Sequence, residues 1–456
     1  MDPFATVGVV ALLVTVLALL GRWQHRIDTY QRDEVLASIY EARERGTDQA
    51  LAQYPHIDEQ SCIGCGSCIA ACPEEQVIGL VNGVARVVHG ARCIGHARCA
   101  DVCPVGAIQV GLGDTSGRTD IPILSDALET SRRGIYIAGE LGGLALIRIA
   151  IEQGVQAVGI IANELRGQVA PSGASPMVDV LVVGAGPAGL AAGLEAKRLG
   201  LSALVIDRED LGGTVRKYPR RKLTIVGQVS LPLHGLVKQP EFLKEELIDF
   251  WEAIIAKHEI DVRTGLTLNT IDGEVGAFTA KTSGGIVRAR RVILALGRRG
   301  APRKLGVPGE DQEKVLYQLI DASTYRNEHL LVVGGGDSAI EAATGLADQT
   351  GNTVTLSYRR ENFFRLKARN EERIREYVDE GRIRVLFESK VVAIDEDFAY
   401  LERVKGGEVE TVKVENAYTF VFAGGEPPYA FLRGLGVEFG GGQPEGLREA
   451  RIEVEA

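Results

Sequence analysis

The cysteines of this chain are confined to one short stretch, where their spacing could hold metal clusters. There are seven, all between Cys62 and Cys103. They form two runs, Cys62-x2-Cys65-x2-Cys68-x3-Cys72-Pro73 and Cys93-x2-His96-x2-Cys99-x3-Cys103-Pro104. In such runs three close thiolates surround one iron–sulfur cubane, and the cysteine before proline reaches the other cluster. The pattern predicts one-electron transfer in a reducing compartment.

This crossed arrangement divides the side chains into two ligand sets. The first set is Cys62, Cys65, Cys68 and Cys103. The second set is Cys72, Cys93 and Cys99, with His96 in the place of an eighth cysteine. Two interpretations of His96 stay open. Either it ligates the second cluster and raises its potential, as in Rieske centres, or it is a bystander beside a three-iron cluster.

The cysteines could also belong to a zinc ribbon or a disulfide knot. Zinc sites seldom use two interlocked runs that each close with Cys-Pro, and seven thiols cannot all pair. Two iron–sulfur clusters are therefore favoured, of the 4Fe-4S type or, for the second, 3Fe-4S. We expect a dicluster ferredoxin domain over about residues 56–112.

Residues 1–22 are expected to form a membrane anchor. Phe4–Gly21 carry no charge, and that length can span a bilayer as a helix. Arg22, Arg26 and Arg32 follow, so the positive-inside rule places the later residues in the cytoplasm. The alternative, a cleaved signal peptide, needs a basic n-region and a small-x-small cleavage site, and neither is evident. We expect a single-pass protein of the cell inner membrane whose catalytic domains face the cytoplasm.

A glycine-rich turn between a strand and a helix predicts a dinucleotide site. The strand at 178–183 leads into Gly184-Ala-Gly186-Pro-Ala-Gly189, a helix, and a second strand that ends at Asp207. The glycines permit a tight turn and let a pyrophosphate approach the helix N-terminus, and an acid about twenty residues on accepts ribose hydrogen bonds. In this order of elements the motif is strong. A turn that serves only helix packing is the alternative.

A second turn of the same kind favours a second nucleotide. This turn follows the strand that ends at Val333, and we expect Gly334, Gly336, Ser338 and Ala339 to contact the nucleotide. The next strand ends in Arg359 and Arg360, with Arg365 close behind, rather than in an acid. Guanidinium groups there suit a 2′-phosphate, so NADPH is favoured and NADH is the alternative. The alternative is that these arginines only form a solvated, charged surface and bind no nucleotide.

From about residue 178 to 437 the chain resembles the thioredoxin-reductase-like pyridine-nucleotide flavoproteins. The matching pieces are VVGAGPAGL, DLGGTV at 210–215, ILALGRRGAPRKLGVPGE at 293–310, VVGGGDSAIEAA at 332–343 and SYRRENFFR at 357–365. The resemblance implies that the first glycine turn holds FAD and that the inserted second unit holds NAD(P)H. It also implies that Gly212 and Gly213 of the DLGGTV loop belong to the FAD site.

The chain departs from this family at its redox thiols. Thioredoxin reductases place a Cys-x-x-Cys pair just before the second glycine motif. Residues 317–328, YQLIDASTYRNE, contain no cysteine. Thiol–disulfide chemistry within this chain is therefore excluded unless an external thiol docks on the flavin.

A second departure concerns the family's closing FAD motif, which is missing from the C-terminus. A similar segment, GIYIAGELGGLALIRIAIEQGVQAVGIIANEL, occurs at 134–165. We interpret this as a circular permutation, which neighbouring termini permit. The resemblance implies that Gly139 and Glu140, where Asp is usual, lie at the flavin, and that a helix starting near Gly142 points its positive end there. An unrelated strand–helix pair is the alternative.

These observations predict an α/β fold class. It comprises two Rossmann-like three-layer domains for FAD and NAD(P), a small α+β dicluster ferredoxin domain and one N-terminal transmembrane helix. The predicted parts are an anchor (1–22), a charged helical linker (23–55), the ferredoxin domain (56–112), the displaced closing segment of the FAD domain (113–170), the FAD domain (178–300), the NAD(P) domain (301–426) and a tail returning to the FAD domain (427–456). A short linker, PSGASP, is expected at 171–176.

The expected function is that of a membrane-anchored NAD(P)H oxidoreductase. It would pass electrons between NADPH, FAD, two iron–sulfur clusters and an external carrier, which is a ferredoxin, a cytochrome or a quinone-linked partner. A flavin-dependent reductase of low-molecular-weight disulfides and a non-catalytic redox-sensing subunit of a membrane complex are the alternatives. No catalytic acid, base or nucleophile is required. The net charge of −10 argues against nucleic acid, and homodimerisation is a family expectation.

Overall fold

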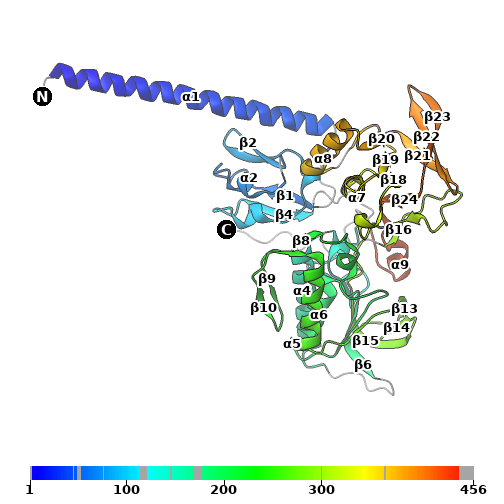
Figure 1. The fold of residues 1–456 in the computed structure, drawn as a ribbon. Coiled ribbons are helices and arrows are strands. Elements are labelled where there is room, and N and C mark those ends of the chain that lie inside the picture. Colours follow the sequence, from blue (N-terminus) through cyan, green and yellow to red (C-terminus); the bar gives the residue numbers. More distant parts are fainter. Residues whose placement is uncertain are drawn as a thin grey trace. The chain divides into compact units, whose positions relative to one another are not determined.

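A computed structural model shows the fold of the chain (Figure 1). It describes residues 3–44, 46–48, 53–74, 76–112, 121–143, 146–168, 176–298, 300–363 and 366–440. The chain divides into two compact units, Met1–Gly113 and Asp114–Ala456. Each unit has a hydrophobic core of its own.

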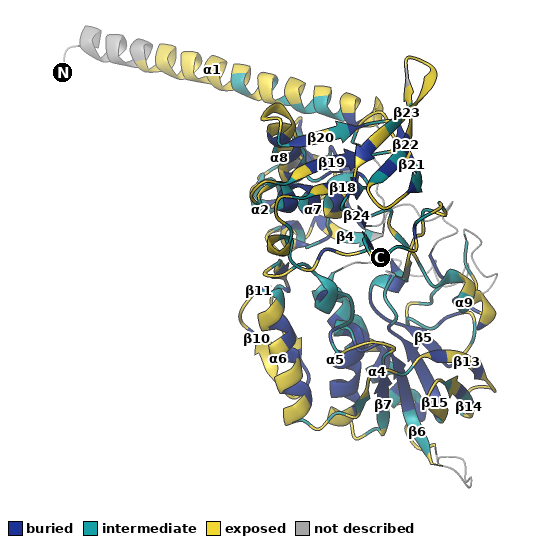
Figure 2. Ribbon diagram, turned by 45° about the vertical axis from the view of Figure 1, so that its right-hand side comes forward, coloured by how far each residue is buried: buried dark blue, intermediate teal, exposed yellow. Residues whose placement is uncertain are grey.

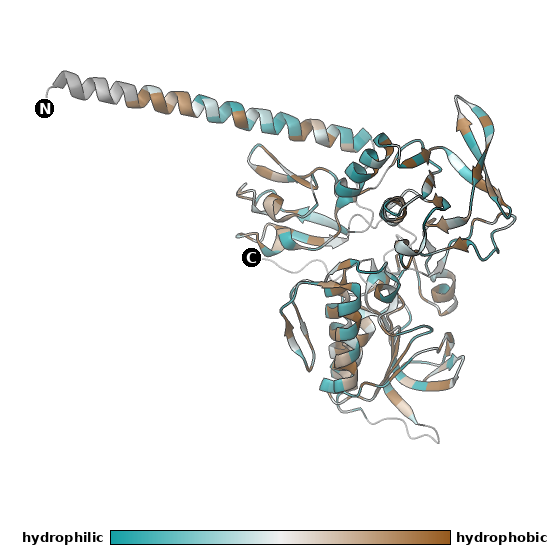
Figure 3. Ribbon diagram, viewed as in Figure 1, coloured by the Kyte–Doolittle hydropathy of each residue, from teal (hydrophilic) through white to brown (hydrophobic). Residues whose placement is uncertain are grey.

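The chain begins with one long helix, α1 (Pro3–Glu44), which runs through the predicted boundary between anchor and linker. Its described side chains are mostly exposed (Figure 2), and the apolar ones gather N-terminal to the charged ones (Figure 3). Within the described part of the chain, no helix is long and apolar enough to cross a membrane. The predicted anchor finds no support there, and the side chains of residues 1–12 lie outside the described part.

The predicted ferredoxin domain is a small α+β unit. β1 (Gln53–Ile57) pairs antiparallel with β4 (Ile108–Leu112), and β2 (Ile78–Val81) pairs antiparallel with β3 (Val84–Val87). The helical elements are α2 (Ser67–Ala71), a 3-10 turn (Gly90–Arg92) and α3 (Arg98–Asp101). Because Gln53 already pairs with Leu112, the domain begins before the predicted residue 56. The linker predicted as helical to residue 55 ends its helix at Glu44.

The FAD domain predicted at 178–300 is built on one sheet with a buried centre (Figure 2). Its strand order is β12-β7-β6-β15-β14-β13, and β5 also pairs with β15. The strands are β5 (Ile135–Ile137), β6 (Met177–Val183), β7 (Ala203–Ile206), β12 (Val262–Arg263), β13 (Leu268–Asp272), β14 (Phe278–Thr282) and β15 (Gly285–Leu294). The run MVDVLVV of β6 is almost wholly apolar, as expected for a parallel strand buried on both faces.

Helices and two small strand pairs cover this sheet. The helices are α4 (Ile147–Leu165), α5 (Pro187–Arg198) and α6 (Lys244–Lys257). The strand pairs are β8 (Leu223–Ile225) with β11 (Glu241–Leu243) and β9 (Val229–Leu231) with β10 (Gly235–Val237). One core cluster joins residues of α4, α5 and α6, so all three helices are fastened to the same domain.

The displaced closing segment is part of this domain. β5 pairs in parallel with β15, and α4 packs on α5. The hydroxyl of Tyr136 donates to Glu164 (2.6 Å), which also accepts from Arg291 Nε (2.9 Å). The helix predicted to start near Gly142 begins only at Ile147. A 3-10 turn (Glu140–Gly142) precedes it, followed by a glycine with φ +107°, a left-handed conformation that an α-helix excludes.

The predicted linker at 171–176 falls largely outside the described residues, which omit 169–175. The predicted C-terminal tail returns to the FAD domain as far as residue 440. There α9 (Tyr429–Gly434) places Leu432 in one core cluster with Ile135 and Ile137 of β5. Residues 441–456 of this tail lie outside the described residues.

The NAD(P) domain predicted at 301–426 repeats the parallel design. Its sheet order is β17-β24-β18-β19-β20, and a separate antiparallel sheet has the order β21-β22-β23. The elements are β17 (Val315–Leu316), a 3-10 turn (Ala322–Thr324), β18 (His329–Val333), α7 (Asp337–Ala347), β19 (Thr353–Ser357), α8 (Ala368–Asp379), β20 (Ile383–Leu386), β21 (Ser389–Ile394), β22 (Phe398–Lys405), β23 (Glu408–Glu415) and β24 (Tyr418–Val421). The entering and leaving chain pair as β16 (Ala301–Pro302) and β25 (Gly425–Glu426).

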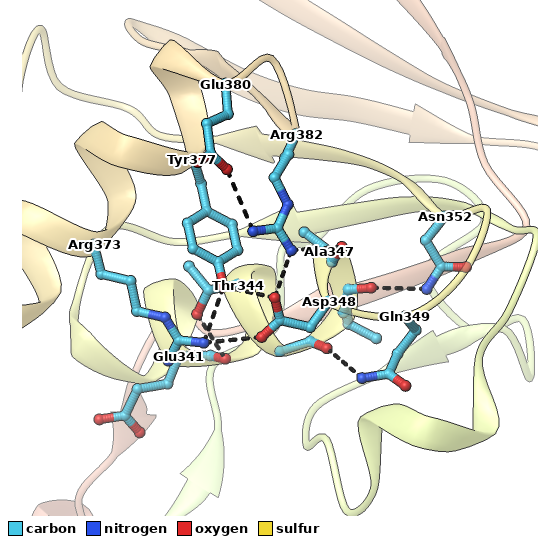
Figure 4. Close-up of polar contacts among 12 residues, drawn as sticks. Glu341, Thr344, Ala347, Asp348, Gln349, Asn352, Arg373, Tyr377, Glu380 and Arg382 are labelled. Atoms are coloured by element: carbon cyan, nitrogen blue, oxygen red, sulfur yellow. Dashed lines mark hydrogen bonds and ion pairs between the residues drawn. The ribbon is translucent and has the colours of Figure 1, made fainter.

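A polar cluster at the end of α7 connects this helix with α8 and β20 (Figure 4). The Asp348 carboxylate accepts from Tyr377 Oη (2.6 Å), Arg373 Nη2 (3.0 Å) and Arg382 Nη2 (2.5 Å). The Arg382 guanidinium also lies 4.0 Å from the centroid of the Tyr377 ring. One carboxylate thus holds two side chains of α8 and one from the turn that leads into β20.

We expect Asp348→Ala to destabilise the NAD(P) domain by about 2 kcal/mol, because it removes the shared acceptor of three donors. Thermal unfolding measures the loss, which corresponds to a fall of several degrees in the Tm. Glu380→Gln is the matched control, since Glu380 contacts only the Arg382 guanidinium in this cluster, at 3.4 Å. Equal Tm shifts in the two variants would contradict a central role for Asp348.

Candidate functional site

Three glycines shape the turn between β6 and α5, each for a different reason. Gly184 has φ +115°, and a Cβ there would lie 2.2 Å from the Ala295 carbonyl oxygen. A Cβ on Gly189 would lie 1.8 Å from the Gly184 carbonyl oxygen. Around Gly186, by contrast, no atom of the described residues lies within 4 Å of such a Cβ. The turn keeps an open cradle at the helix N-terminus, which suits a pyrophosphate.

The predicted ribose acid, Asp207, lies beside this turn. It follows β7, the strand that pairs in parallel with β6. One carboxylate oxygen accepts from the Ala185 backbone N–H (2.7 Å), and the other accepts from the Glu209 N–H (2.8 Å). These bonds hold the carboxylate at the edge of the cradle, where an adenosine ribose would lie in a dinucleotide site.

Two further predicted segments close around the cradle. A Cβ on Gly213 would lie 3.1 Å from Gly186 Cα, and the Gly212 N–H donates to the Ala185 carbonyl (2.8 Å). From the displaced segment, a Cβ on Gly139 would lie 3.2 Å from the Ala188 Cβ of α5. The structure therefore brings these segments together with the first glycine turn. Glu140 begins the 3-10 turn after Gly139, is half-buried, and its contact with the flavin stays a prediction.

The second glycine turn, between β18 and α7, follows the same design. A Cβ on Gly334 (φ +144°) would lie 2.6 Å from the Phe422 carbonyl oxygen. Among the described residues, no atom lies within 4 Å of a Cβ on Gly336, so this turn also has an open cradle. Ser338 is exposed at the start of α7, whereas Ala339 is fully buried. The side chain of Ala339 supports the turn from the core instead of facing a nucleotide.

The arginines predicted to read a 2′-phosphate lie at the same edge of the sheet as this turn. β18 and β19 are parallel neighbours, with Val333 opposite Ser357, so both strands end side by side. Arg359 and Arg360 follow β19 and are both exposed. Arg365 lies outside the described residues. Two of the three predicted guanidinium groups are thus placed where a ribose phosphate would be read.

In the N-terminal unit, the cysteines line two separate cavities. The first, which is open to solvent, is lined by Cys62, Cys65, Cys68 and Cys103. The Ala107 N–H donates to Cys103 Sγ (3.2 Å), and the Ala85 N–H donates to Cys62 Sγ (3.5 Å). This is the predicted first set, with one cysteine from the other run. Four converging thiols fit a cluster of several irons.

The second cavity is lined by the predicted second set, Cys72, Cys93, His96 and Cys99. Glu74 also lines it. Among the described residues, the two cavities included, no group of three or more His, Cys, Asp or Glu side chains is arranged to hold a single metal ion. The donor atoms instead lie around the two cavities, which is the arrangement that a multi-iron cluster needs.

Burial controls the protonation of the thiols in the second cavity. It raises the pKa of Cys93 to about 11 and that of Cys99 to about 12. As free side chains both would carry protons at neutral pH. Iron binds thiolates, so cluster insertion must release these protons.

Known proteins share both parts of this arrangement. Residues 181–445 match the pyridine nucleotide-disulphide oxidoreductase family, and residues 55–110 match the 4Fe-4S dicluster domain family. The chain belongs to the pyridine nucleotide-disulphide oxidoreductases. It is an NAD(P)H-dependent flavin oxidoreductase that carries a 4Fe-4S ferredoxin domain. The predicted fusion is thereby confirmed.

Two curated relatives and one solved structure illustrate the similarity. Over 263 residues the oxidoreductase is 26% identical to the bacilliredoxin reductase Bdr of Bacillus subtilis (strain 168), covering 57% of this chain and 80% of that protein. Over 240 residues it is 31% identical to a ferredoxin–NADP reductase of Thermus thermophilus, covering 51% and 67%. The bacillithiol disulfide reductase Bdr (YpdA) of Staphylococcus aureus superposes with a TM-score of 0.51 at 26% identity, covering 57% and 81%.

Three residues that support these sites in the oxidoreductase escaped sequence reasoning. Gln153 of α4 accepts from the Gly139 N–H (2.8 Å) and so holds the displaced loop. A Cβ on Gly335 would lie 2.3 Å from the Tyr358 ring, so this aromatic residue packs under the second glycine turn. Lys222 of the FAD domain pairs with Glu341 of α7 (3.0 Å). Of these three residues, only Tyr358 could have been identified from a local sequence signal, because it directly follows a strand.

Proposed function

We propose that this oxidoreductase passes electrons between NADPH and an external carrier by way of FAD and two iron–sulfur clusters. The observation that carries the proposal is the crossed lining of the two cysteine cavities, each of which takes one cysteine from the other run. Residues 104–456, which include the flavoprotein part, contain no cysteine. No thiol in that part can therefore accept electrons from the flavin instead of the clusters.

Each cofactor has a set of residues that would hold it. The cradle at Gly186, with Asp207, Gly212, Gly213 and Gly139, would hold FAD. The cradle at Gly336, with Arg359 and Arg360, would hold NADPH. When bound, NADPH supplies a hydride, FAD converts the electron pair into single electrons, and the clusters accept these one at a time. The chain positions these groups, and the direction of flow follows their potentials.

The partner is proposed to be a small electron carrier. The similarity to ferredoxin–NADP reductase favours a ferredoxin. A cytochrome or a quinone-linked protein would serve the same chemistry. Homodimerisation, and attachment to the cell inner membrane through residues 1–22 with the catalytic domains in the cytoplasm, stay predictions from the sequence.

Low-temperature EPR of anaerobic protein tests the proposal. We expect NADPH to bleach the flavin and to produce signals of reduced clusters. The Gly336→Val variant is the matched control, because its filled cradle excludes NADPH while dithionite still reduces its clusters. A bleached flavin with clusters that stay EPR-silent in the unmodified protein, yet appear with dithionite, would contradict an electron path through the ferredoxin domain.

The arginines after β19 are expected to determine the preference for NADPH. Replacing both Arg359 and Arg360 by Gln should raise the KM for NADPH by about 100-fold or more, since each of the two charge-assisted hydrogen bonds contributes about 1.5–3 kcal/mol and about 1.4 kcal/mol is a factor of ten. The KM for NADH should change little. Steady-state kinetics with both nucleotides measure the split. Arg369→Gln, in an exposed residue of α8, is the control. An unchanged ratio of the two KM values would contradict the phosphate role.

A second candidate is the reduction of a low-molecular-weight disulfide at the flavin. The similarity to bacilliredoxin reductase and to bacillithiol disulfide reductase favours it. The cysteine cavities would then have no role in turnover. The two candidates separate when NADPH oxidation is measured with a disulfide and with a ferredoxin, in the unmodified protein and in Cys103→Ser. Disulfide reduction that survives this change, without any ferredoxin reduction in either protein, would favour the second candidate.

A further inference from the structure

His96 stands in the second cysteine run at the position that Cys65 holds in the first. The two loops have matching backbones: Gly64 (φ +66°) corresponds to Gly95 (φ +77°), and Gly66 (φ +73°) corresponds to Ala97 (φ +61°). Ala97 thus takes a left-handed conformation that non-glycine residues rarely adopt. Because imidazole is longer than a thiol, a ring on the same backbone extends beyond the corner that a cysteine sulfur would occupy.

The ring nitrogens of His96 have different surroundings. Nδ1, the nitrogen nearer the backbone, accepts the Arg98 backbone N–H at 3.1 Å. The left-handed turn at Ala97 brings that N–H beneath the ring. A neutral imidazole carries one proton, and a nitrogen that accepts a hydrogen bond does not carry it. The proton of His96 therefore resides on Nε2.

Nε2 lies 4.0 Å from Cys72 Sγ, inside the second cavity. Side chains that ligate different irons of one cubane point away from each other, whereas 4.0 Å lies at the long limit of an N–H···S hydrogen bond. Metal-ligating histidines almost always donate a hydrogen bond from their other ring nitrogen. His96 accepts one there instead, so both nitrogens are arranged for something other than ligation.

We propose that His96 is a positioning residue that donates its Nε2–H to the Cys72 thiolate and does not bind iron. Thiolates of Cys72, Cys93 and Cys99 then hold three corners of the second cluster, and no imidazole holds the fourth. This inference rests on the two clusters proposed above. A hydrogen bond to a ligand sulfur raises the potential of a cluster, so His96 tunes the second cluster through Cys72.

Pulsed EPR of the reduced full-length protein, grown with ¹⁵N-histidine and with natural histidine, tests ligation directly. We expect only a weak nitrogen coupling, from an imidazole that reaches the cluster through a hydrogen bond. A strong coupling like that of Rieske centres would overturn the inference. Iron and sulfide analysis separates a failure of this inference from a failure of the proposed function. A protein that lacks the second cluster would overturn both. Strong coupling in a protein with two clusters would overturn only the inference about His96.

Three variants at position 96 provide a second readout. On mild oxidation the unmodified protein and His96→Phe should both show a three-iron EPR signal, and His96→Cys should lose that signal and keep one iron more per chain. His96→Phe should also lower the reduction potential of the second cluster by ~59 mV, which corresponds to a tenfold change in the ratio of oxidised to reduced cluster. His96→Gln keeps an N–H donor and should therefore lower the potential less. Thermal unfolding confirms that each variant folds. A three-iron signal that appears only in His96→Phe would overturn the inference.

Discussion

The Gly186→Val variant is expected to fold but to purify without FAD. The cradle around Gly186 is open, and its φ of −78° and ψ of −177° are extended values that valine adopts readily. The new side chain would fill the space that a pyrophosphate needs at the helix N-terminus. FAD affinity should fall by about 100-fold or more, ~3 kcal/mol, and NADPH-dependent turnover should be lost. Flavin absorbance and calorimetric titration of FAD measure the effect.

Two further glycine variants make this result specific. Gly189→Ala should fail to fold its domain, because the added Cβ would lie 1.8 Å from the Gly184 carbonyl oxygen. Gly336→Val should retain FAD and lose NADPH binding, since the same open cradle occurs in the other domain. Circular dichroism separates loss of fold from loss of cofactor. If Gly186→Val bound FAD as tightly as the unmodified protein, the pyrophosphate would have to lie elsewhere.

Exchanging the last cysteine of each run is expected to remove the cluster of the opposite run. Cys103 lines the cavity of Cys62, Cys65 and Cys68, so Cys103→Ser should impair the first cluster. Cys72 lines the cavity of the second run, so Cys72→Ser should impair the second cluster. Loss of one ligand should lower cluster occupancy and carrier reduction by at least the roughly 10–100-fold that loss of an outer-shell partner of a ligand typically costs. Iron analysis and the EPR signals of the remaining cluster measure which one is lost.

Cys68→Ser and Cys99→Ser are the matched controls, since each lies within its own run. Cys68→Ser should give the same spectrum as Cys103→Ser, and Cys99→Ser the same as Cys72→Ser. FAD content and the rate of flavin reduction by NADPH should stay unchanged in all four, because these residues belong to the N-terminal unit. If Cys103→Ser matched Cys99→Ser instead, each run would hold its own cluster and the crossed assignment would be wrong.

The glycine turns and the cysteine runs could be recognised from the sequence because their chemistry is local. A strand, a tight turn and a helix start lie within about a dozen residues, so Gly184, Gly186 and Gly189 have their roles irrespective of the rest of the fold. The displaced closing segment was recognisable for the same reason, and β5 indeed pairs with β15. The start of its helix was predicted wrongly, since nothing in the pattern near Gly142 shows the left-handed φ of the glycine that comes after the 3-10 turn.

The extent of the first helix shows the limit of such local reasoning. An uncharged run of the right length predicts a span, and α1 continues from it without interruption into a charged segment that ends at Glu44, so the membrane anchor stays a prediction from the sequence. Hydropathy is a property of the residues present, whereas the extent of a helix depends also on the neighbouring residues in the chain. The linker boundary predicted at residue 55 differs from the structure, because Gln53 already pairs with Leu112, a residue far away in the chain.

From residue types and spacing alone, the cofactors of this oxidoreductase and their order along the chain could be predicted, since each prediction rests on a short contiguous motif. How those motifs meet required the folded chain. The approach of Gly139 to Ala188, the pairing of Lys222 with Glu341 and the Arg98 N–H that donates to His96 depend on packing, on distant strand pairing or on one backbone torsion. Such contacts are set by the net balance of the whole fold, which no short pattern contains.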